Sequence, residues 1–281
     1  MSSATPQPLV HGIFDPATWT VTYVVYERAG SDCAIIDPVL DYDPKSGRTS
    51  HTSADKVIAF VKSQQLTVSW ILETHAHADH VTGSWLMHEA TGCEIGFAAV
   101  VRAENVSLPL SHGDRVAFGG RSLEVRSTPG HTDGCISFVL DDQSLAFSGD
   151  ALLVRGCGRC DFQQGDAHTL WTSITEQIYS LPGACLLYPG HDYSGRNITS
   201  VAEELAFNPR LGAAATERDF VGYMQNMKLP HPHRIAEALP GNMRSGKPRS
   251  TQAAPSWAPV ELSYAGLPEL DSAWVVAHGG E

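Results

Sequence analysis

Short apolar runs separated by polar turns fill the first part of the chain, and they predict β-strands. Residues 20–27 (TVTYVVYE) and 33–37 (CAIID) are two such runs, and they flank a polar turn at 28–32. Residues 54–65 instead carry apolar side chains at helical spacing, with Ser53 as a candidate N-cap. We therefore predict two strands followed by a helix in this region.

The same pattern distinguishes loops from buried strands further along. Residues 41–52 are polar and contain proline and glycine, which predicts a loop. Residues 68–73 predict a strand, and residues 82–91 predict a helix. The short apolar stretches after that helix predict a second sheet, with strands at about 94–100, 115–118, 121–128, 135–140 and 144–148.

The remaining pattern is mostly helical and then fades. Residues 184–188 predict one more strand, and helices are expected at 168–180, 198–207, 215–228 and 232–238. From residue 249 the chain becomes linker-like and has too few apolar positions for a second core. We therefore predict one domain over residues 1–248 and a linker-like tail at 249–281.

One polar segment stands out against this background. The run Thr74-His75-Ala76-His77-Ala78-Asp79-His80 follows the strand predicted at 68–73. It places three imidazoles and one carboxylate within six residues, and these groups are ligands that suit zinc, iron or manganese. A single run of this kind does not complete a metal site, so further ligands are expected from later loops.

Three later segments can supply those ligands. Pro129-Gly130-His131, Gly149-Asp150 and Pro189-Gly190-His191 each follow an apolar, strand-like stretch. Any one of the 13 histidines could be an ordinary surface or core residue. Because His131, Asp150 and His191 all follow predicted strands and lie beside glycine, the sequence predicts that they build one metal site. The same site would include His75, His77, Asp79 and His80.

Composition narrows the expected partners. The formal net charge is −12, and no Lys/Arg-rich block is present, so we expect no nucleic-acid partner. No apolar run approaches the roughly 20 residues of a membrane span, and residues 1–8 lack a secretory signal, so we expect no membrane partner. The six scattered cysteines suggest reduced thiols and a cytoplasmic location.

The ordered ligand set resembles that of the metallo-β-lactamase superfamily, over about residues 10 to 245. The resemblance implies an α/β (α+β) fold, the αββα sandwich, in which two mixed β-sheets are flanked by helices. It places the metal at one edge of the sheets. Because the superfamily includes both hydrolases and oxidoreductases, the fold leaves the reaction open.

A second stretch resembles the persulfide dioxygenases of this superfamily. It contains Arg155-Gly-Cys-Gly-Arg159 followed by Asp161-Phe-Gln163, and His191-Asp-Tyr193 and Asn208-Pro-Arg210 also match the family. The resemblance implies one Fe(II) per chain, held by His75, His131 and Asp150. It also implies that glutathione persulfide is oxidised with O₂ and water to sulfite and glutathione, and a homodimer is expected because similar proteins are commonly dimeric.

The other predicted site residues follow from the same resemblance. His77, Asp79, His80 and His191 would orient the ligands and nearby waters. Tyr193 is a candidate catalytic residue, and the candidate contacts for glutathione are Arg155, Tyr193, Arg196 and Arg210, because a guanidinium can bind a carboxylate bidentately.

Two alternatives stay open at this stage. A two-metal glyoxalase II-like hydroxyacylglutathione thioesterase needs the same ligands, so spacing alone does not decide between one iron and two zinc ions. The Cys157-x-x-Cys160 pair could be packed thiols, a redox-sensitive pair or half a structural zinc site. We favour packed thiols, because no second Cys or His pair completes a zinc site.

Overall fold

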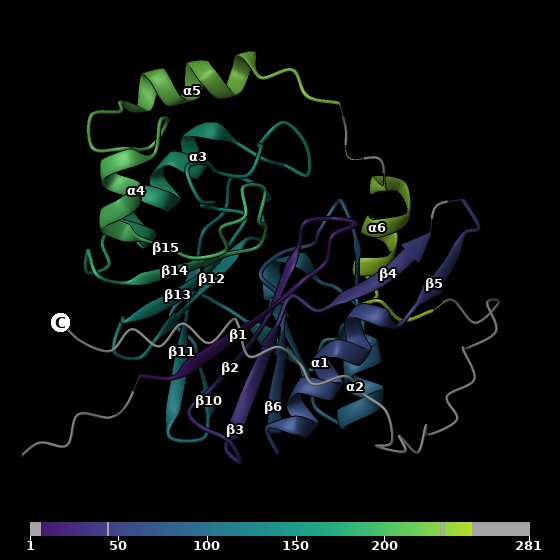
Figure 1. Ribbon diagram of the computed structural model, residues 1–281. Helices are drawn as coiled ribbons and strands as arrows, with labels where there is room; N and C mark the ends of the chain where they lie inside the picture. The colour runs from purple at the N-terminus through teal and green to yellow at the C-terminus, as the bar shows by residue number, and fades with distance from the viewer. Residues whose placement is uncertain (1–6, 44, 231, 233, 249–281) are drawn as a thin grey trace, which may run out of the picture. The chain divides into compact units, whose positions relative to one another are not determined.

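Two six-stranded sheets face one another in the computed structural model, which describes residues 7–43, 45–230, 232 and 234–248 (Figure 1). In spatial order, the first sheet contains β1 (Leu9–Phe14), β2 (Val21–Tyr26), β3 (Asp32–Ile36), β6 (Thr67–Leu72), β8 (Ile95–Ala98) and β9 (Leu108–Leu110). The second contains β10 (Arg115–Phe118), β11 (Arg121–Ser127), β12 (Ile136–Leu140), β13 (Leu145–Gly149), β14 (Leu186–Pro189) and β15 (Thr199–Ser200). A small third sheet joins β5 (Arg48–Ser50), β4 (Val39–Asp43) and β7 (Val81–Thr82).

Helices lie outside the two large sheets. They are α1 (Thr52–Ser63), α2 (Ser84–Thr91), α3 (Ala167–Thr172), α4 (Val201–Phe207), α5 (Glu217–Asn226) and α6 (Ile235–Asn242). A 3-10 turn covers Ala99–Val101, and a π-helical segment, Ser173–Ile178, continues α3.

Both large sheets are mixed, as predicted. In the first, β3, β6, β8 and β9 pair in parallel while β1, β2 and β3 pair antiparallel. In the second, only β13 and β14 pair in parallel. The predicted αββα sandwich is therefore confirmed.

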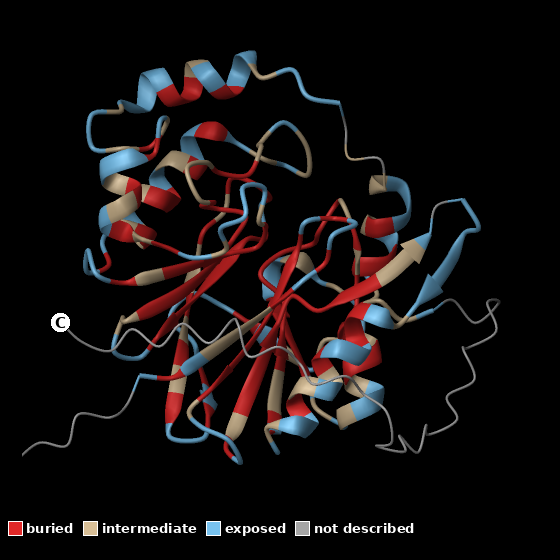
Figure 2. Ribbon diagram, in the orientation of Figure 1, coloured by how far each residue is buried: buried red, intermediate tan, exposed pale blue. Residues whose placement is uncertain are grey.

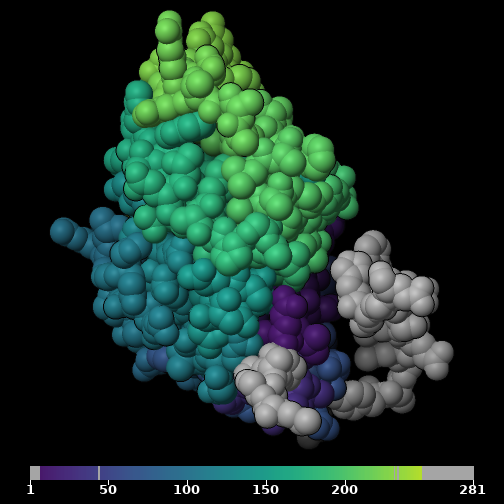
Figure 3. Space-filling view, turned by 90° about the vertical axis from the view of Figure 1, so that its left-hand side faces the viewer, coloured from purple at the N-terminus to yellow at the C-terminus, as the bar shows by residue number. Residues whose placement is uncertain are grey.

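Figure 2 shows buried residues along most strands of the two large sheets. Alternation along the strands divides the apolar residues among three clusters. On β2, Tyr23 and Val25 face the second sheet, whereas Val24 and Tyr26 pack with residues of α1 and α2. On β12, Phe138 lies between the sheets, and Val139 on the opposite face packs under α3 and α5. Figure 3 shows the side of the molecule where the teal and green chain of the second sheet and its helices forms one continuous surface.

Residues 94–100 were expected in the second sheet, and this prediction is wrong. The strand there, β8, pairs in parallel with β6 of the first sheet. A parallel pair needs a crossover connection, and α2 supplies it by leading the chain back to the sheet it came from. The short strand β9, which was not predicted, pairs in parallel with β8 and extends the first sheet.

The loop predicted at 41–52 is also wrong in part. Much of this segment belongs to the β4–β5 hairpin, and its second strand, β5, is too polar and too short to give an apolar signal. Ser53 does not cap α1, which begins at Thr52. Instead, the backbone N–H and the hydroxyl of Ser53 each donate to Asp41 of β4, at 2.8 Å.

The compact unit extends through Lys247, close to the predicted domain boundary at residue 248. The tail predicted at 249–281 lies outside the described residues. Within the described part of the chain, no helix has both the length and the apolar character needed to cross a membrane.

Phe138 provides a test of the packing between the sheets. It is fully buried, so Phe138→Ala should lower the free energy of unfolding by about 3–5 kcal/mol through lost burial and an unfilled cavity. Urea unfolding followed by circular dichroism measures this loss. Phe14→Ala is the matched control, because Phe14 is 41% exposed and its truncation should cost far less. Equal losses in the two variants would contradict the assignment of Phe138 to the core.

Candidate metal centre and its cavity

The seven predicted site residues all follow strands of the two large sheets. His75, His77, Asp79 and His80 occupy the loop between β6 and β7. His131 follows β11, Asp150 directly follows β13, and His191 follows β14. Because these strand ends lie at one edge of the sandwich, residues more than 100 positions apart are brought into one cluster.

His75, His131 and Asp150 form one set of donors that could hold a metal ion. One ligand atom from each lies within 4.8 Å of those of the other two, and all three residues are buried. Nε2 of His75 is 4.0 Å from Oδ2 of Asp150, and Nε2 of His131 is 3.7 Å from the same oxygen. Two imidazoles and one carboxylate can therefore contribute to one metal ion, as the sequence predicts.

The direction of the His75 ring is fixed by Thr74 and Asp37. The Thr74 hydroxyl donates to Oδ2 of Asp37 at 2.7 Å, so its oxygen is left to accept from Nδ1 of His75 at 2.9 Å. With its proton on Nδ1, His75 directs the lone pair of Nε2 toward Asp150. Burial holds the pKa of His75 well below its ordinary value, and the neighbouring His77 adds to this effect, so the ring is neutral and able to bind a metal.

His131 is held in the same tautomer by a different partner. Its Nδ1 lies 2.6 Å from the backbone carbonyl oxygen of Arg159, which can only accept, so Nδ1 donates. Nε2, on the other side of the ring, faces Asp150 and is the nitrogen that can bind a metal. A hydrogen bond on the far nitrogen is the usual way in which proteins orient a metal-binding histidine.

The buried atoms left without hydrogen bonds also fit a metal site. In the described residues these atoms include Oδ1 of Asp150 and Nε2 of His80. Burial alone would raise the pKa of Asp150, but His191 and the other nearby imidazoles outweigh it and hold the pKa well below its ordinary value. A buried carboxylate that stays ionised forms, together with the imidazoles around it, a set of donors that suits a cation.

Two glycines allow the loops to approach this closely. A Cβ atom on Gly190 would lie 2.7 Å from Oδ1 of Asp150. Gly149 has a φ of +50°, and a Cβ atom there would lie 2.6 Å from the hydroxyl oxygen of Thr74. The glycine beside Asp150 and the glycine beside His191, which were part of the signal in the sequence, therefore each have a steric reason.

A second group of donors lies beside the triad. Ligand atoms of His77, Asp79 and His80 fall within 4.8 Å of one another. Nε2 of His191 lies 3.4 Å from Oδ2 of Asp150 and 3.8 Å from Oδ2 of Asp79. Burial would lower the pKa of His191, but the Asp150 and Asp79 carboxylates outweigh it and raise the pKa to about 9.

His77 also faces two buried carboxylates on its other side. Its Nε2 is 3.4 Å from Oδ1 of Asp37 and 3.4 Å from Oε2 of Glu73. Thr82 and Ser84 donate their hydroxyl protons to the other oxygen of Glu73. These contacts hold the His77 ring against the base of the loop.

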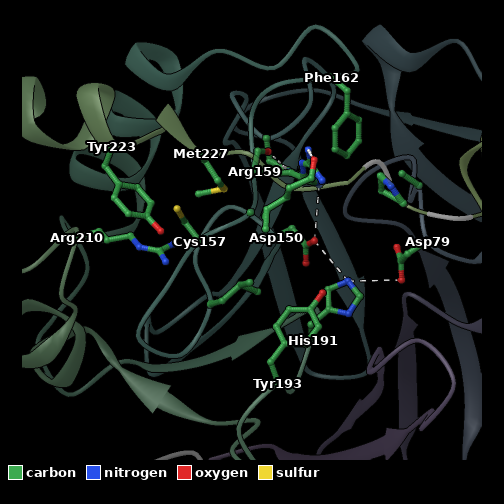
Figure 4. A pocket seen from close by; sticks show the side chains of 16 residues that line it. Asp79, Asp150, Cys157, Arg159, Phe162, His191, Tyr193, Arg210, Tyr223 and Met227 are labelled. Carbon is green, nitrogen blue, oxygen red and sulfur yellow. Dashed lines mark hydrogen bonds and ion pairs between the residues drawn. The ribbon is translucent and has the colours of Figure 1, made fainter. Parts of the chain in front are cut away.

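A cavity of about 320 Å³ opens beside Asp150 and His191. Figure 4 shows Arg210, Cys157 and Tyr223 on one side of it and Asp79 and His191 on the other. Its wall also includes apolar side chains, namely Leu153, Phe162, Met227 and Leu229. Tyr193 lies at the opening, is 62% exposed and stacks on the His191 ring with a centroid distance of 5.1 Å.

The predicted arginines are placed differently from one another. Arg155 and Arg196 do not line the cavity, and both form ion pairs with Glu203. Arg155 also pairs with the buried Glu204. Arg210 does line the cavity, its guanidinium lies 4.1 Å from the centre of the Tyr223 ring, and no carboxylate of the described residues forms an ion pair with it.

All six cysteines have free thiols. Cys157 lines the cavity, and burial raises its pKa to about 12, so it is a poor nucleophile. Burial also raises the pKa of Cys160, to about 11. Among the described residues, no group of side chains that could hold a metal contains a cysteine. These observations favour packed thiols over a redox pair or a zinc site.

Several residues around the site were missed in the sequence. Asp37 and Glu73 are buried strand-end carboxylates, which a search for strand-end polar residues would have found. Arg159 holds His131 through its carbonyl group, and its guanidinium binds the carbonyl oxygens of Leu229 and Pro230. Asn242 binds the metal loop from α6, and no local signal indicates this contact.

The contact between Thr74 and His75 can be tested with an isosteric change. Thr74→Val removes the hydroxyl that accepts from Nδ1, so metal affinity should fall roughly 10- to 100-fold. Competition with a chelator measures the affinity. Thr74→Ser keeps the hydroxyl and should retain nearly the parent affinity. Parent-like affinity in Thr74→Val would show that this hydrogen bond does not orient the ligand.

Comparisons with known proteins agree with this geometry. The family model of the metallo-beta-lactamase superfamily matches residues 17–191. The mitochondrial persulfide dioxygenase ETHE1 of Homo sapiens is 43% identical over 239 residues, which cover 85% of this chain and 89% of that protein. A probable metallo-hydrolase of Burkholderia pseudomallei is 38% identical and is matched over 85% of this chain and 93% of its own length.

A solved structure is similar over the same region. The crystal structure of ETHE1 from Myxococcus xanthus has a TM-score of 0.77 and 38% sequence identity, and the match covers 85% of this chain and 100% of that one. The chain therefore belongs to the metallo-β-lactamase superfamily and, within it, to the persulfide dioxygenases.

Proposed function

We propose that this protein is an Fe(II)-dependent dioxygenase that oxidises glutathione persulfide. One iron ion per chain would be held by His75, His131 and Asp150. The observation that carries this proposal is the convergence of two imidazoles and one carboxylate beside a cavity. The similarity of this chain to a persulfide dioxygenase, over 85% of its length, supports this choice of reaction.

The donor set suits iron in an open coordination shell. Three protein ligands on one face leave positions for other molecules, and bound Fe(II) would supply the redox chemistry that brings O₂ and the persulfide together. Thr74 and Arg159 hold the two imidazoles in the tautomer that binds a metal. The role of the protein is to fix these ligands in place and to present the substrate to them.

The overall reaction balances without a second cofactor. Glutathione persulfide, O₂ and water give glutathione, sulfite and two protons. The S–S bond breaks, the outer sulfur is oxidised by four electrons, and O₂ accepts these electrons. No external reductant is needed, because the persulfide is itself the electron donor.

Arg210 is our candidate for the residue that binds a glutathione carboxylate. It lies across the cavity from Asp79 and His191 and has no ion pair with a carboxylate of the described residues (Figure 4). Tyr193, at the opening, is the proposed contact for the substrate near the metal. Arg155 and Arg196 would first have to leave Glu203, so we assign them no direct role in binding glutathione.

The competing function is a two-metal hydroxyacylglutathione thioesterase. It is favoured by one specific observation: Asp79, His80 and His191 lie beside the triad, where a second ion could be held. Similarity to a probable metallo-hydrolase also leaves hydrolysis in view. This alternative predicts two metal ions per chain and turnover without O₂.

Two further expectations from the sequence stay predictions. A homodimer is one, and a cytoplasmic location is the other. Size-exclusion chromatography with light scattering tests the first, and cell fractionation tests the second.

Metal content and oxygen uptake, measured on the same preparation, test the proposed function. We expect about one iron per chain by mass spectrometry, and O₂ uptake on an oxygen electrode when glutathione persulfide is added. Asp150→Asn should lose iron and activity together, because it removes the charged ligand. About two zinc ions per chain with hydrolysis of an acylglutathione and no O₂ uptake would establish the thioesterase instead.

The role of Arg210 can be tested with steady-state kinetics. Arg210→Ala should raise KM for glutathione persulfide roughly tenfold or more, because a charge-assisted hydrogen bond is lost, while iron content stays at the parent value. Arg115→Ala is the control: Arg115 lies on β10, is exposed and does not line the cavity. An unchanged KM in Arg210→Ala would remove this residue from the substrate site.

A further inference from the structure

We propose that Asn242 is a positioning residue of the metal centre, which holds the loop running from the candidate ligand His75 through His77, Asp79 and His80 in the shape that binds metal. Asn242 is the last residue of α6, and its side chain does not line the cavity. It would therefore act through the loop rather than on the substrate. The inference rests on the proposed function only in so far as this loop serves a metal site.

The side-chain amide of Asn242 is fully used by the loop. Nδ2 donates to the carbonyl oxygen of His77 at 2.7 Å and to that of His80 at 2.9 Å. Oδ1 accepts from the backbone N–H of Thr82 at 2.7 Å. An amide group offers two N–H donors and one oxygen, so a single side chain satisfies three backbone groups of the loop.

These three bonds enclose the part of the loop that carries the second group of donors. His77 lies on one side of Asp79, and His80 and Thr82 lie on the other. The backbone between β6 and β7 is irregular, and His77 and His80, whose carbonyl groups Asn242 binds, are both buried. Buried carbonyl groups need donors, and Asn242 supplies them from a residue more than 150 positions away.

The segment around Asn242 is itself firmly attached. We call residues 241–246 the C-terminal clasp. The backbone carbonyl oxygen of Ser245 accepts from the backbone N–H of Trp85 at 2.8 Å. The Ser245 hydroxyl donates to the carbonyl oxygen of Glu104 at 2.7 Å. A Cβ atom on Gly246 would lie 2.1 Å from the carbonyl oxygen of Thr82, so the clasp lies directly against the end of the loop.

Burial makes the contact sensitive to small chemical changes. Asn242 is 1% exposed, so water cannot replace a lost bond at this position. An aspartate has nearly the same shape but offers no N–H donor when ionised. It would place a carboxylate oxygen against two carbonyl oxygens, and the loop would have to move to relieve the repulsion.

The test compares Asn242→Asp with the parent protein, using Fe(II), Zn(II) and Co(II) as probes. We expect metal affinity, measured by chelator competition, to fall roughly 10- to 100-fold. We also expect the visible absorption bands of the Co(II)-loaded protein to change, because they report ligand geometry. A role in fold stability alone would lower the melting temperature of the metal-free protein and leave the Co(II) spectrum unchanged, and that result would overturn the proposal.

Asn105→Asp is the matched control. Asn105 is exposed and donates to the carbonyl oxygen of Arg244 in the same clasp, at 3.2 Å, but it does not contact the metal loop. Its affinity for metal should stay within about twofold of the parent. If Asn242→Asp does not fold, Asn242→Gln replaces it, because the longer side chain keeps the amide but misplaces it; parent affinity together with a parent Co(II) spectrum in that variant would also overturn the proposal.

The outcome is independent of the proposed reaction. Chelator competition with metal alone requires no persulfide and no O₂. A parent protein that binds metal but shows no persulfide-dependent O₂ uptake would refute the dioxygenase and leave the role of Asn242 intact. Persulfide-dependent O₂ uptake by the parent protein, with unchanged metal affinity and Co(II) spectrum in Asn242→Asp, would support the dioxygenase and refute the role of Asn242.

Discussion

The hydrogen bond from Thr74 to Asp37 joins the first sheet to the metal centre, and the placement of the ligands depends on it. β3 and β6 are parallel neighbours, so the residues that follow them meet at one edge of the sheet. Thr74 satisfies both oxygens of the buried Asp37, through its backbone N–H and its hydroxyl. Since the same hydroxyl accepts from His75, the pairing of two strands determines where the first ligand points.

The clustering of the candidate ligands could be predicted because their signal is local. His131, Asp150 and His191 each follow a strand and lie beside a glycine, and close approach explains that glycine next to Asp150. The two sheets could be predicted for the same reason, since buried strands give continuous apolar runs. Short polar strands such as β5 gave no signal, because only their partners make them strands.

Other features depend on contacts that a sequence does not display. The sheet to which β8 belongs is decided by its crossover through α2 rather than by its own residues. In the sequence, Arg155 and Arg210 are equal candidates for binding a substrate carboxylate. In the structure, Arg155 forms an ion pair with the buried Glu204, whereas Arg210 lines the cavity. The net charge of the chain is −12, and the fold decides which arginine remains available to bind an anion.

The contact of Asn242 with the metal loop has a consequence for the order of events during biosynthesis. Ribosomes add about 5–20 residues per second, so the residues between His80 and Asn242 take roughly 10–30 s to appear. Throughout that interval the nascent chain carries the His75 loop without the side chain that binds the carbonyl groups of His77 and His80. A metal ion that binds early would meet an incomplete site. Metal loading is therefore expected to follow synthesis of the complete chain.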